Sequence, residues 1–162
     1  MLKVLPAVLA IYILIFSSCL SSKHPQKSEG EPALKFLSRY VVPYDHQFAN
    51  TTIGGLSGID YHPEKEEYYL ISDDRSAKNP ARFYTARVLI NNNKIDTVVF
   101  LKNTFLRDRM GNFYPNSMQD PFHTPDPEAL RYNSTNNTFI WSSEGERIVD
   151  SKKIILENPA IT

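Results

Sequence analysis

The feature that most constrains the fold is an internal repeat of short runs in which apolar and polar residues alternate. Residues 55–61 alternate in this way, and after a turn residues 67–72 form a second run that ends at Asp73. The same order recurs 71 positions later, where Glu144 takes the place of Asp73. A period of two residues predicts β-strands. The recurrence favours two copies of one antiparallel unit, and the alternative is a chance likeness between two hairpins.

Two further β-rich runs, residues 82–90 and 94–101, follow the first copy. They are joined by Asn91-Asn92-Asn93, whose residues tolerate the left-handed backbone conformations of tight turns. Four strands thus lie between residues 55 and 101, which is the size of one β-propeller blade. Residues 102–125 are rich in proline and predict an insertion on one face. We therefore expect an all-β fold of antiparallel, β-propeller-like blades, with about two blades present.

The predicted ring of blades is incomplete. A propeller closes with roughly four to eight blades, and two blades leave sheet faces and edges uncovered. One more strand is predicted at residues 152–156, and the sequence given ends at Thr162. We expect residues 34–162 to be the N-terminal part of a longer propeller domain, or a part that is completed by association.

The N-terminal segment has the pattern of an export signal. Residues 4–16 are almost unbroken apolar sequence after Lys3, which is typical of a signal-peptide core and too short for a standard membrane span. The run ends in Phe16-Ser17-Ser18-Cys19, which resembles the bacterial lipobox, where the cysteine is lipidated. An ordinary signal peptide with an incidental cysteine is the alternative.

This pattern divides the chain and predicts its location. We expect a lipoprotein signal peptide over residues 1–18 and a flexible tether over residues 19–33, which is polar and contains proline and glycine. Lipid on Cys19 would anchor the protein to a membrane. The expected location is extracytoplasmic, on the periplasmic or surface face of a bacterial outer membrane.

Charge and motif content exclude several kinds of chemistry. The chain has 18 basic and 18 acidic residues, so it has no net charge to attract nucleic acid, and no nucleic-acid partner is expected. Its single cysteine forms no paired motif for zinc, and its histidines lack the spacing of a zinc-protease helix. Ser57 lies in a predicted strand without the glycine pattern of a hydrolase nucleophile, which favours a structural role.

Acidic residues at the ends of predicted strands are the candidate metal ligands. Calcium prefers six to eight hard oxygen ligands, which carboxylates supply well. The repeat makes the ends of two strands equivalent, so acids from neighbouring blades should point to the same face and could share one cation. The alternative is that these acids only form turns. The candidates are Asp73, Asp74, Asp126, Glu128 and Glu144.

Three arginines are candidates for binding a small anionic ester, because a guanidinium can grip two phosphate or carboxylate oxygens at once. They are Arg75, Arg82 and Arg131. The alternative is that they form salt bridges with the acids named above. If a cation and arginines share a cleft, the expected reaction is hydrolysis of a phosphoester or another ester.

Five blocks of sequence between residues 54 and 145 carry a resemblance to a known family. They are Gly54-Gly55-Leu56-Ser57-Gly58-Ile59-Asp60-Tyr61, Tyr69-Leu70-Ile71-Ser72-Asp73-Asp74-Arg75, Pro80-Ala81-Arg82-Phe83-Tyr84, Asp126-Pro127-Glu128-Ala129-Leu130-Arg131 and Trp141-Ser142-Ser143-Glu144-Gly145. In this order they resemble the phytase-like family, also called the esterase-like activity of phytase family.

The resemblance implies a secreted β-propeller related in architecture to the calcium-dependent alkaline phytases, usually longer than this chain and often lipid-anchored in bacteria. We therefore expect an extracytoplasmic, phytase-like hydrolase that acts on a phosphate or other ester with calcium. Two alternatives stay open. One is a non-catalytic, calcium-stabilised propeller that binds a sugar, a peptide or a protein through residues 102–125. The other is an inactive truncated product.

Overall fold

The computed structural model describes residues 34–145, 147–150, 153–156 and 160–161, the last three ranges by their backbone. The predicted signal peptide, Cys19 and the tether lie outside these residues. The chain divides into two units, Met1–Phe36 and Leu37–Thr162. Every strand and contact described below lies within the second unit. No described residue belongs to a helix long and apolar enough to cross a bilayer.

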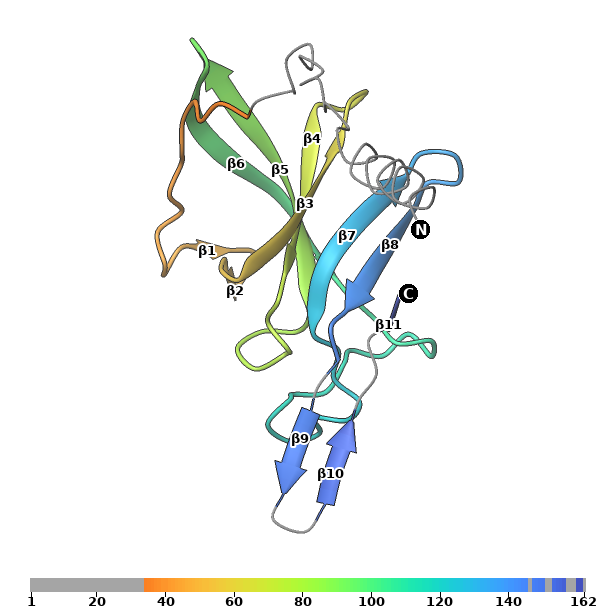
Figure 1. Ribbon diagram of the computed structural model, residues 1–162. Helices are drawn as coiled ribbons and strands as arrows, with labels where there is room; N and C mark the ends of the chain where they lie inside the picture. Colours follow the sequence, from red (N-terminus) through yellow and green to blue (C-terminus); the bar gives the residue numbers. More distant parts are fainter. Residues whose placement is uncertain (1–33, 146, 151–152, 157–159, 162) are drawn as a thin grey trace, which may run out of the picture. The chain divides into compact units, whose positions relative to one another are not determined.

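The first repeat folds as a four-stranded antiparallel sheet (Figure 1). Its strands are β3 (Leu56–His62), β4 (Glu67–Ser72), β5 (Arg82–Asn91) and β6 (Lys94–Phe105), and they pair in sequence order. The predicted asparagine turn joins β5 to β6, with Asn92 and Asn93 at φ values of 50° and 59°. Such left-handed values allow a tight turn that matches the twist of the strands.

The boundary predicted for the insertion is wrong by a few residues. Residues 102–105 belong to β6, because Thr104 pairs with Phe83 and Phe105 with Arg82 across the sheet. Cross-strand pairing with β5 therefore extends β6 beyond residue 101. The irregular segment starts after Phe105 and contains an isolated bridge between Arg107 and Phe113.

The second repeat forms a hairpin of β7 (Pro127–Asn133) and β8 (Thr138–Ser143), to which β11 (Ala160–Ile161) adds a third antiparallel strand. The strand predicted near residues 152–156 is present as β10 (Lys153–Leu156). It pairs with β9 (Arg147–Asp150), which was not predicted. A small hairpin of β1 (Gln47–Phe48) and β2 (Thr51–Thr52) precedes the first sheet.

The first strands of the two repeats lie side by side, so residues that correspond in the repeat touch each other. Asp60 of β3 accepts hydrogen bonds from Arg131 Nη1 at 3.1 Å and from the backbone N–H of Tyr132 at 2.7 Å. A Cβ on Gly58 would lie 2.9 Å from the carbonyl oxygen of Glu128, so only glycine allows this close approach. Two antiparallel sheets that meet at their first strands have the arrangement of neighbouring propeller blades.

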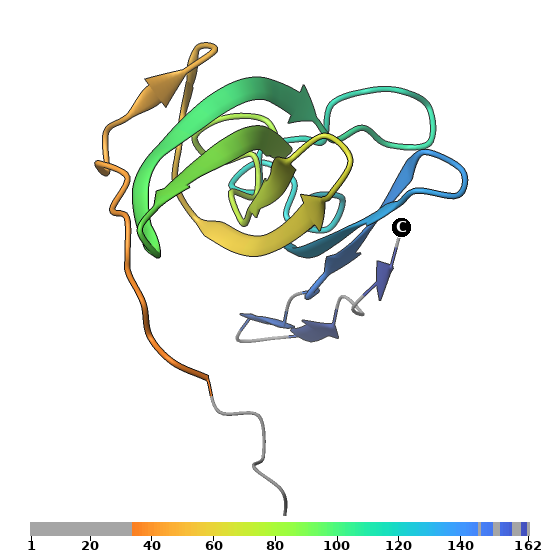
Figure 2. The same cartoon turned by 90° about the horizontal axis from the view of Figure 1, so that it is seen from above.

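The apolar core lies between the two sheets. Tyr69, Ile71 and Phe83 of the first sheet pack against Leu130 and Trp141 of the second. Figure 2 shows the strands of the first sheet nested together, with β7 and β8 on one side of them. Within the described residues the fold is all-β and antiparallel, and it contains no closed barrel.

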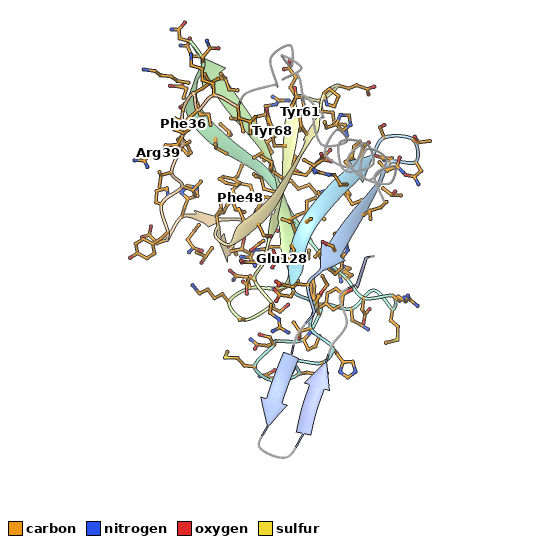
Figure 3. The ribbon with its side chains drawn as sticks, viewed as in Figure 1. Phe36, Arg39, Phe48, Tyr61, Tyr68 and Glu128 are labelled. Atoms are coloured by element: carbon orange, nitrogen blue, oxygen red, sulfur yellow. The ribbon has the colours of Figure 1, made fainter. Side chains whose placement is uncertain are left out.

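The opposite face of the first sheet is only partly covered. Leu70 and Tyr84 are buried there beneath residues such as Phe48 from the preceding segment. Farther along this face, the rings of Tyr61 and Tyr68 lie tilted against each other, with centroids 4.6 Å apart (Figure 3). These tyrosines lie far from Glu128, which stands at the start of β7.

Candidate metal centre

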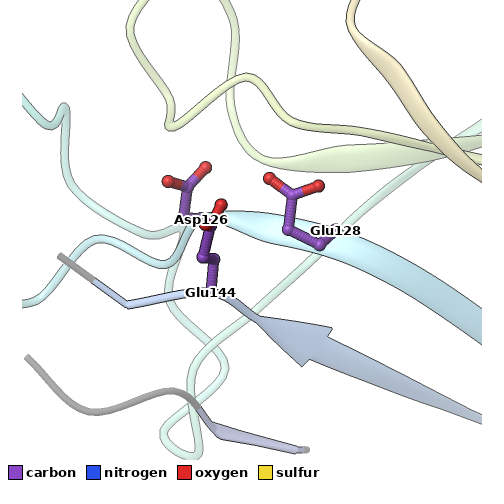
Figure 4. A group of neighbouring side chains, drawn as sticks. All are labelled: Asp126, Glu128 and Glu144. Carbon is purple, nitrogen blue, oxygen red and sulfur yellow. The ribbon is translucent and has the colours of Figure 1, made fainter.

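Three carboxylates come together at one end of the second hairpin. Asp126 precedes β7, Glu128 is the second residue of β7, and Glu144 follows β8. The pairing of β7 with β8 brings them together, and the backbone N–H of Glu144 donates a hydrogen bond to the carbonyl oxygen of Asp126 at 3.0 Å. One carboxylate oxygen from each residue lies within 4.8 Å of the other two (Figure 4).

The electrostatics of this acidic cluster centre on Glu128. Burial raises the pKa of Glu128, and the negative charges of Asp126, Glu144 and Asp73 raise it further. A hydrogen bond with Glu144 also favours the protonated form. Because like charges oppose ionisation, a proton or a cation stabilises this arrangement.

Asp73 approaches the cluster from the first sheet, at the end of β4. Its backbone N–H donates to the carbonyl oxygen of Gly55 at 2.7 Å. Its Oδ1 lies so close to Gly55 that a Cβ there would be 1.7 Å away, and Gly55 also has a φ of 55°. A side chain at this position would displace the carboxylate. Since Asp73 and Glu144 both act on the pKa of Glu128, the corresponding strand ends of the two repeats face the same site.

A pocket of about 350 Å³ lies next to Asp73, and none of Asp126, Glu128 and Glu144 lines it. Asp73, Arg75 and Lys78 line it from the loop between β4 and β5, and Ser117 lines it from the insertion. The Nε of Arg75 lies 3.9 Å from a carboxylate oxygen of Asp126. Arg75 therefore connects the pocket to the carboxylates.

Asp74 and Arg82 form an ion pair that is shielded from water. Arg82 is 2% exposed, and its Nη1 donates to Asp74 Oδ2 at 2.8 Å. The carboxylate of Asp74 also accepts the backbone N–H groups of Ala77, Lys78 and Asn79 at 2.9 to 3.1 Å. These bonds hold the loop after β4, which is the salt-bridge alternative of the sequence analysis. Both residues also line the pocket, and their roles in binding a metal and a substrate stay predictions.

The pKa of Asp74 fits this structural role. Burial acts to raise it, but the hydrogen bonds from Arg82 and from the backbone outweigh burial and lower the pKa below its usual value.

Arg131 is also separate from the cluster. Its guanidinium is largely exposed and pairs with Asp60, a residue that the sequence analysis did not single out. Lys78 and Ser117 were missed as well, because no motif marks them and only the fold brings them to the pocket.

An all-β fold of blade-like sheets, with carboxylates gathered where the strands of two repeats end, defines a propeller-type protein with a candidate site for a hard cation. The chain belongs to the phytase-like family, because the family model described as "Phytase-like: Esterase-like activity of phytase" matches residues 51–161. No curated protein and no solved structure gives a significant match. The family has a β-propeller fold and typically binds calcium, which confirms the predicted family and fold class and indicates a phytase-like, hydrolase-type role.

Proposed function

We propose that the protein is an extracytoplasmic, phytase-like hydrolase that cleaves a phosphate or other ester with the help of a calcium ion. Asp126, Glu128 and Glu144 would hold the ion, and Asp73 would contribute from the first sheet. The observation that carries the proposal is the approach of three carboxylates within 4.8 Å beside a pocket that contains Arg75.

The chemistry of the donor set fits calcium. The cluster offers carboxylate oxygens, which are hard ligands, and includes neither histidine nor cysteine. Calcium accepts six to eight oxygens in flexible geometry, so water, substrate oxygens or backbone carbonyls can complete the set. Burial raises the pKa of Glu128, and the charges of the neighbouring carboxylates raise it further; a divalent cation would relieve that repulsion.

The chain's own residues would bind and orient the substrate. A pocket of about 350 Å³ suits a small ligand. The guanidinium of Arg75 and the ammonium of Lys78 would attract an anionic group there, and the pairing of Arg75 with Asp126 would hold that group beside the carboxylates. When bound, calcium supplies electrophilic activation of the ester and makes an attacking water more acidic.

The proposed location rests on the N-terminal sequence. The apolar residues 4–16 and Cys19 support export and lipid anchoring at a bacterial outer membrane. Tethering would keep the site outside the cytoplasm, and calcium is more abundant there than inside the cell. A small anionic ester remains the proposed partner, and the balanced charge of the chain gives no support for binding to nucleic acid.

The test combines turnover with calcium binding. Purified full-length protein is assayed on p-nitrophenyl phosphate and p-nitrophenyl butyrate, with added calcium and with a chelator. We expect hydrolysis of at least one ester, its loss in chelator, and a loss of at least tenfold in Glu144→Gln. Glu64→Gln, which removes one charge from an exposed turn, is the matched control and should keep full activity.

Two outcomes would overturn the proposal. One is turnover that is the same in chelator and in Glu144→Gln as in the untreated protein. The other is calcium-dependent melting without turnover on either ester, which would support the non-catalytic, calcium-stabilised module instead.

A further inference from the structure

Two arginines line the pocket, and they are held in different ways. Arg82 is buried, and its Nη1 donates to Asp74 Oδ2 at 2.8 Å. The side chain of Arg75 is 19% exposed, and its Nε lies 3.9 Å from Oδ2 of Asp126. This distance is longer than a hydrogen bond, so these two atoms attract each other only through their charges. The charge of Arg75 is therefore less firmly neutralised by Asp126 than the charge of Arg82 is by Asp74.

The irregular segment after β6 holds Arg75 between the pocket and the acidic cluster. Arg75 Nη2 donates to the carbonyl oxygen of Pro121 at 3.4 Å, and the backbone N–H of Ser117 donates to the carbonyl oxygen of Arg75 at 3.2 Å. Asn116 Nδ2 donates to the carbonyl oxygen of Ala77, in the same loop as Arg75, at 3.2 Å. These contacts keep the guanidinium beside the cluster while Arg75 lines the pocket.

Asp126 is shared between Arg75 and the acidic cluster. One of its carboxylate oxygens lies within 4.8 Å of oxygens of Glu128 and Glu144 (Figure 4), and its Oδ2 faces Arg75. The charge of Asp126 cannot serve both neighbours fully, because Arg75 repels a cation held by the cluster and competes with that cation for Asp126. An anion in the pocket would neutralise Arg75 and remove this opposition. Binding at the cluster and binding in the pocket are therefore linked.

We propose that Arg75 couples calcium binding at the cluster to anion binding in the pocket. Without a cation, Asp126 neutralises Arg75; with a cation, Asp126 is engaged by the cluster and the charge of Arg75 serves the anion. The inference rests on the proposed function, because it takes the cluster as the calcium site and the pocket as the anion site. Coupling between two sites is reciprocal and typically changes an affinity by about 5- to 150-fold, and we expect a factor of about ten in each direction.

The first experiment measures binding to the unchanged full-length protein by isothermal titration calorimetry. The anion is phenylphosphonate, which resembles a phosphate monoester but has a carbon–phosphorus bond that is not hydrolysed. Calcium is titrated with and without saturating phenylphosphonate, and phenylphosphonate is titrated with and without saturating calcium. We expect each ligand to bind about tenfold more tightly in the presence of the other. Equal affinities with and without the second ligand would overturn the proposal.

The second experiment repeats the calcium titrations on two arginine variants. Arg75→Gln should raise the calcium affinity by at least threefold in the absence of anion, because it removes a positive charge that opposes the cation. Phenylphosphonate should then leave the calcium affinity of this variant unchanged. Arg87→Gln is the matched control, because it removes the same charge from an exposed position of β5 that does not line the pocket. It should behave like the parent protein.

The sign of the change separates coupling from a structural defect, since a damaged site would bind calcium more weakly. Weaker calcium binding by Arg75→Gln would therefore overturn the proposal. An effect of phenylphosphonate on Arg75→Gln as large as on the parent would overturn it too, because the anion would then contact the cation without the help of Arg75.

Turnover of the two p-nitrophenyl esters by the same samples tests the proposed function separately. Turnover without coupling would overturn the role of Arg75 and leave the hydrolase in place. Coupling without turnover would support the role of Arg75 and overturn the hydrolase. The absence of any calcium binding would overturn both.

Discussion

Replacing Glu128 by glutamine separates cation binding from electrostatic repulsion. Its carboxylate lies within 4.8 Å of those of Asp126 and Glu144. Two like charges at this separation repel each other by about 1 kcal/mol at the permittivity of water and by about 3 kcal/mol at an effective permittivity of 20. Because the cluster is partly exposed, the lower figure applies. Glu128 faces two such charges, and physiological salt roughly halves each repulsion at this distance. Glu128→Gln should therefore stabilise the cation-free protein by about 1 kcal/mol at pH 7, which raises the melting temperature by about 4 °C.

Calcium should reverse the order of the melting temperatures of the parent protein and Glu128→Gln. A ligand at one hundred times its dissociation constant stabilises the folded state by about 2.7 kcal/mol, or about 11 °C at the same conversion. Glu128→Gln removes one of three charged ligands and should lose most of this gain. The variant is thus expected to melt above the parent protein in chelator and below it in calcium.

The raised pKa of Glu128 makes the free energy of unfolding of the cation-free protein depend on pH. The folded protein binds this proton more tightly than the unfolded chain does. The stabilising effect of the proton is therefore complete below the unfolded value of about 4.3. It is lost as the pH rises from there through the higher folded pKa. Glu128→Gln should lack this decline in the cation-free state.

The assay is thermal unfolding followed by circular dichroism, in chelator and over a calcium titration. Glu64→Gln removes one negative charge from an exposed turn and serves as the control. The reasoning is refuted if Glu128→Gln lowers the melting temperature in chelator, or if calcium raises the melting temperature of Glu128→Gln as much as that of Glu64→Gln.

Three further predictions concern the fold. Asp74→Asn removes the anion that pairs with a buried arginine and should cost about 3 kcal/mol in urea unfolding; a loss below about 1 kcal/mol would contradict a buried ion pair. Gly58→Ala should lower the free energy of unfolding by about 1–3 kcal/mol, because the added Cβ meets the backbone of β7. Gly54→Ala should be tolerated, because nothing lies within 4 Å of the added Cβ. Equal losses in the two variants would argue against close packing of β3 on β7. Leu130→Ala should lower the free energy of unfolding by about 2–5 kcal/mol, because Leu130 is 1% exposed. Ile59 is the corresponding residue of the first repeat and is 52% exposed, so Ile59→Ala should lower it by less than about 1 kcal/mol. Similar unfolding midpoints for the two variants would disprove the assigned core.

Much of the fold could be predicted because strand patterns are local. Alternating residues place Tyr69 and Ile71 on one face of β4 and Leu70 on the other, and this period of two is visible in the sequence. The asparagine turn before β6 was visible for the same reason. The extension of β6 to Phe105 was not, because it depends on pairing with β5 rather than on the composition of residues 102–105.

The candidate site was predictable in part. Strand ends and the repeat pointed to Asp73 and Glu144 as corresponding acids, and the structure brings both close enough to Glu128 to raise its pKa. Asp74 stands next to Asp73 in the sequence and could not be distinguished from it there. Only the fold shows that the Asp74 carboxylate turns toward Arg82 and three backbone N–H groups, while Asp73 lies against Gly55.

The sequence alone determined the order of the strands, their alternating faces and the spacing of the two copies, because each depends on residues that are near neighbours along the chain. Which carboxylates share a site was decided by tertiary structure. Asp126, Glu128 and Glu144 meet because β7 and β8 pair in one register. Arg82, the first residue of β5, pairs with Asp74 of the preceding loop, and both are shielded from water. Interactions over a few ångströms depend on pairing and burial, and these exist only once the sheets have packed.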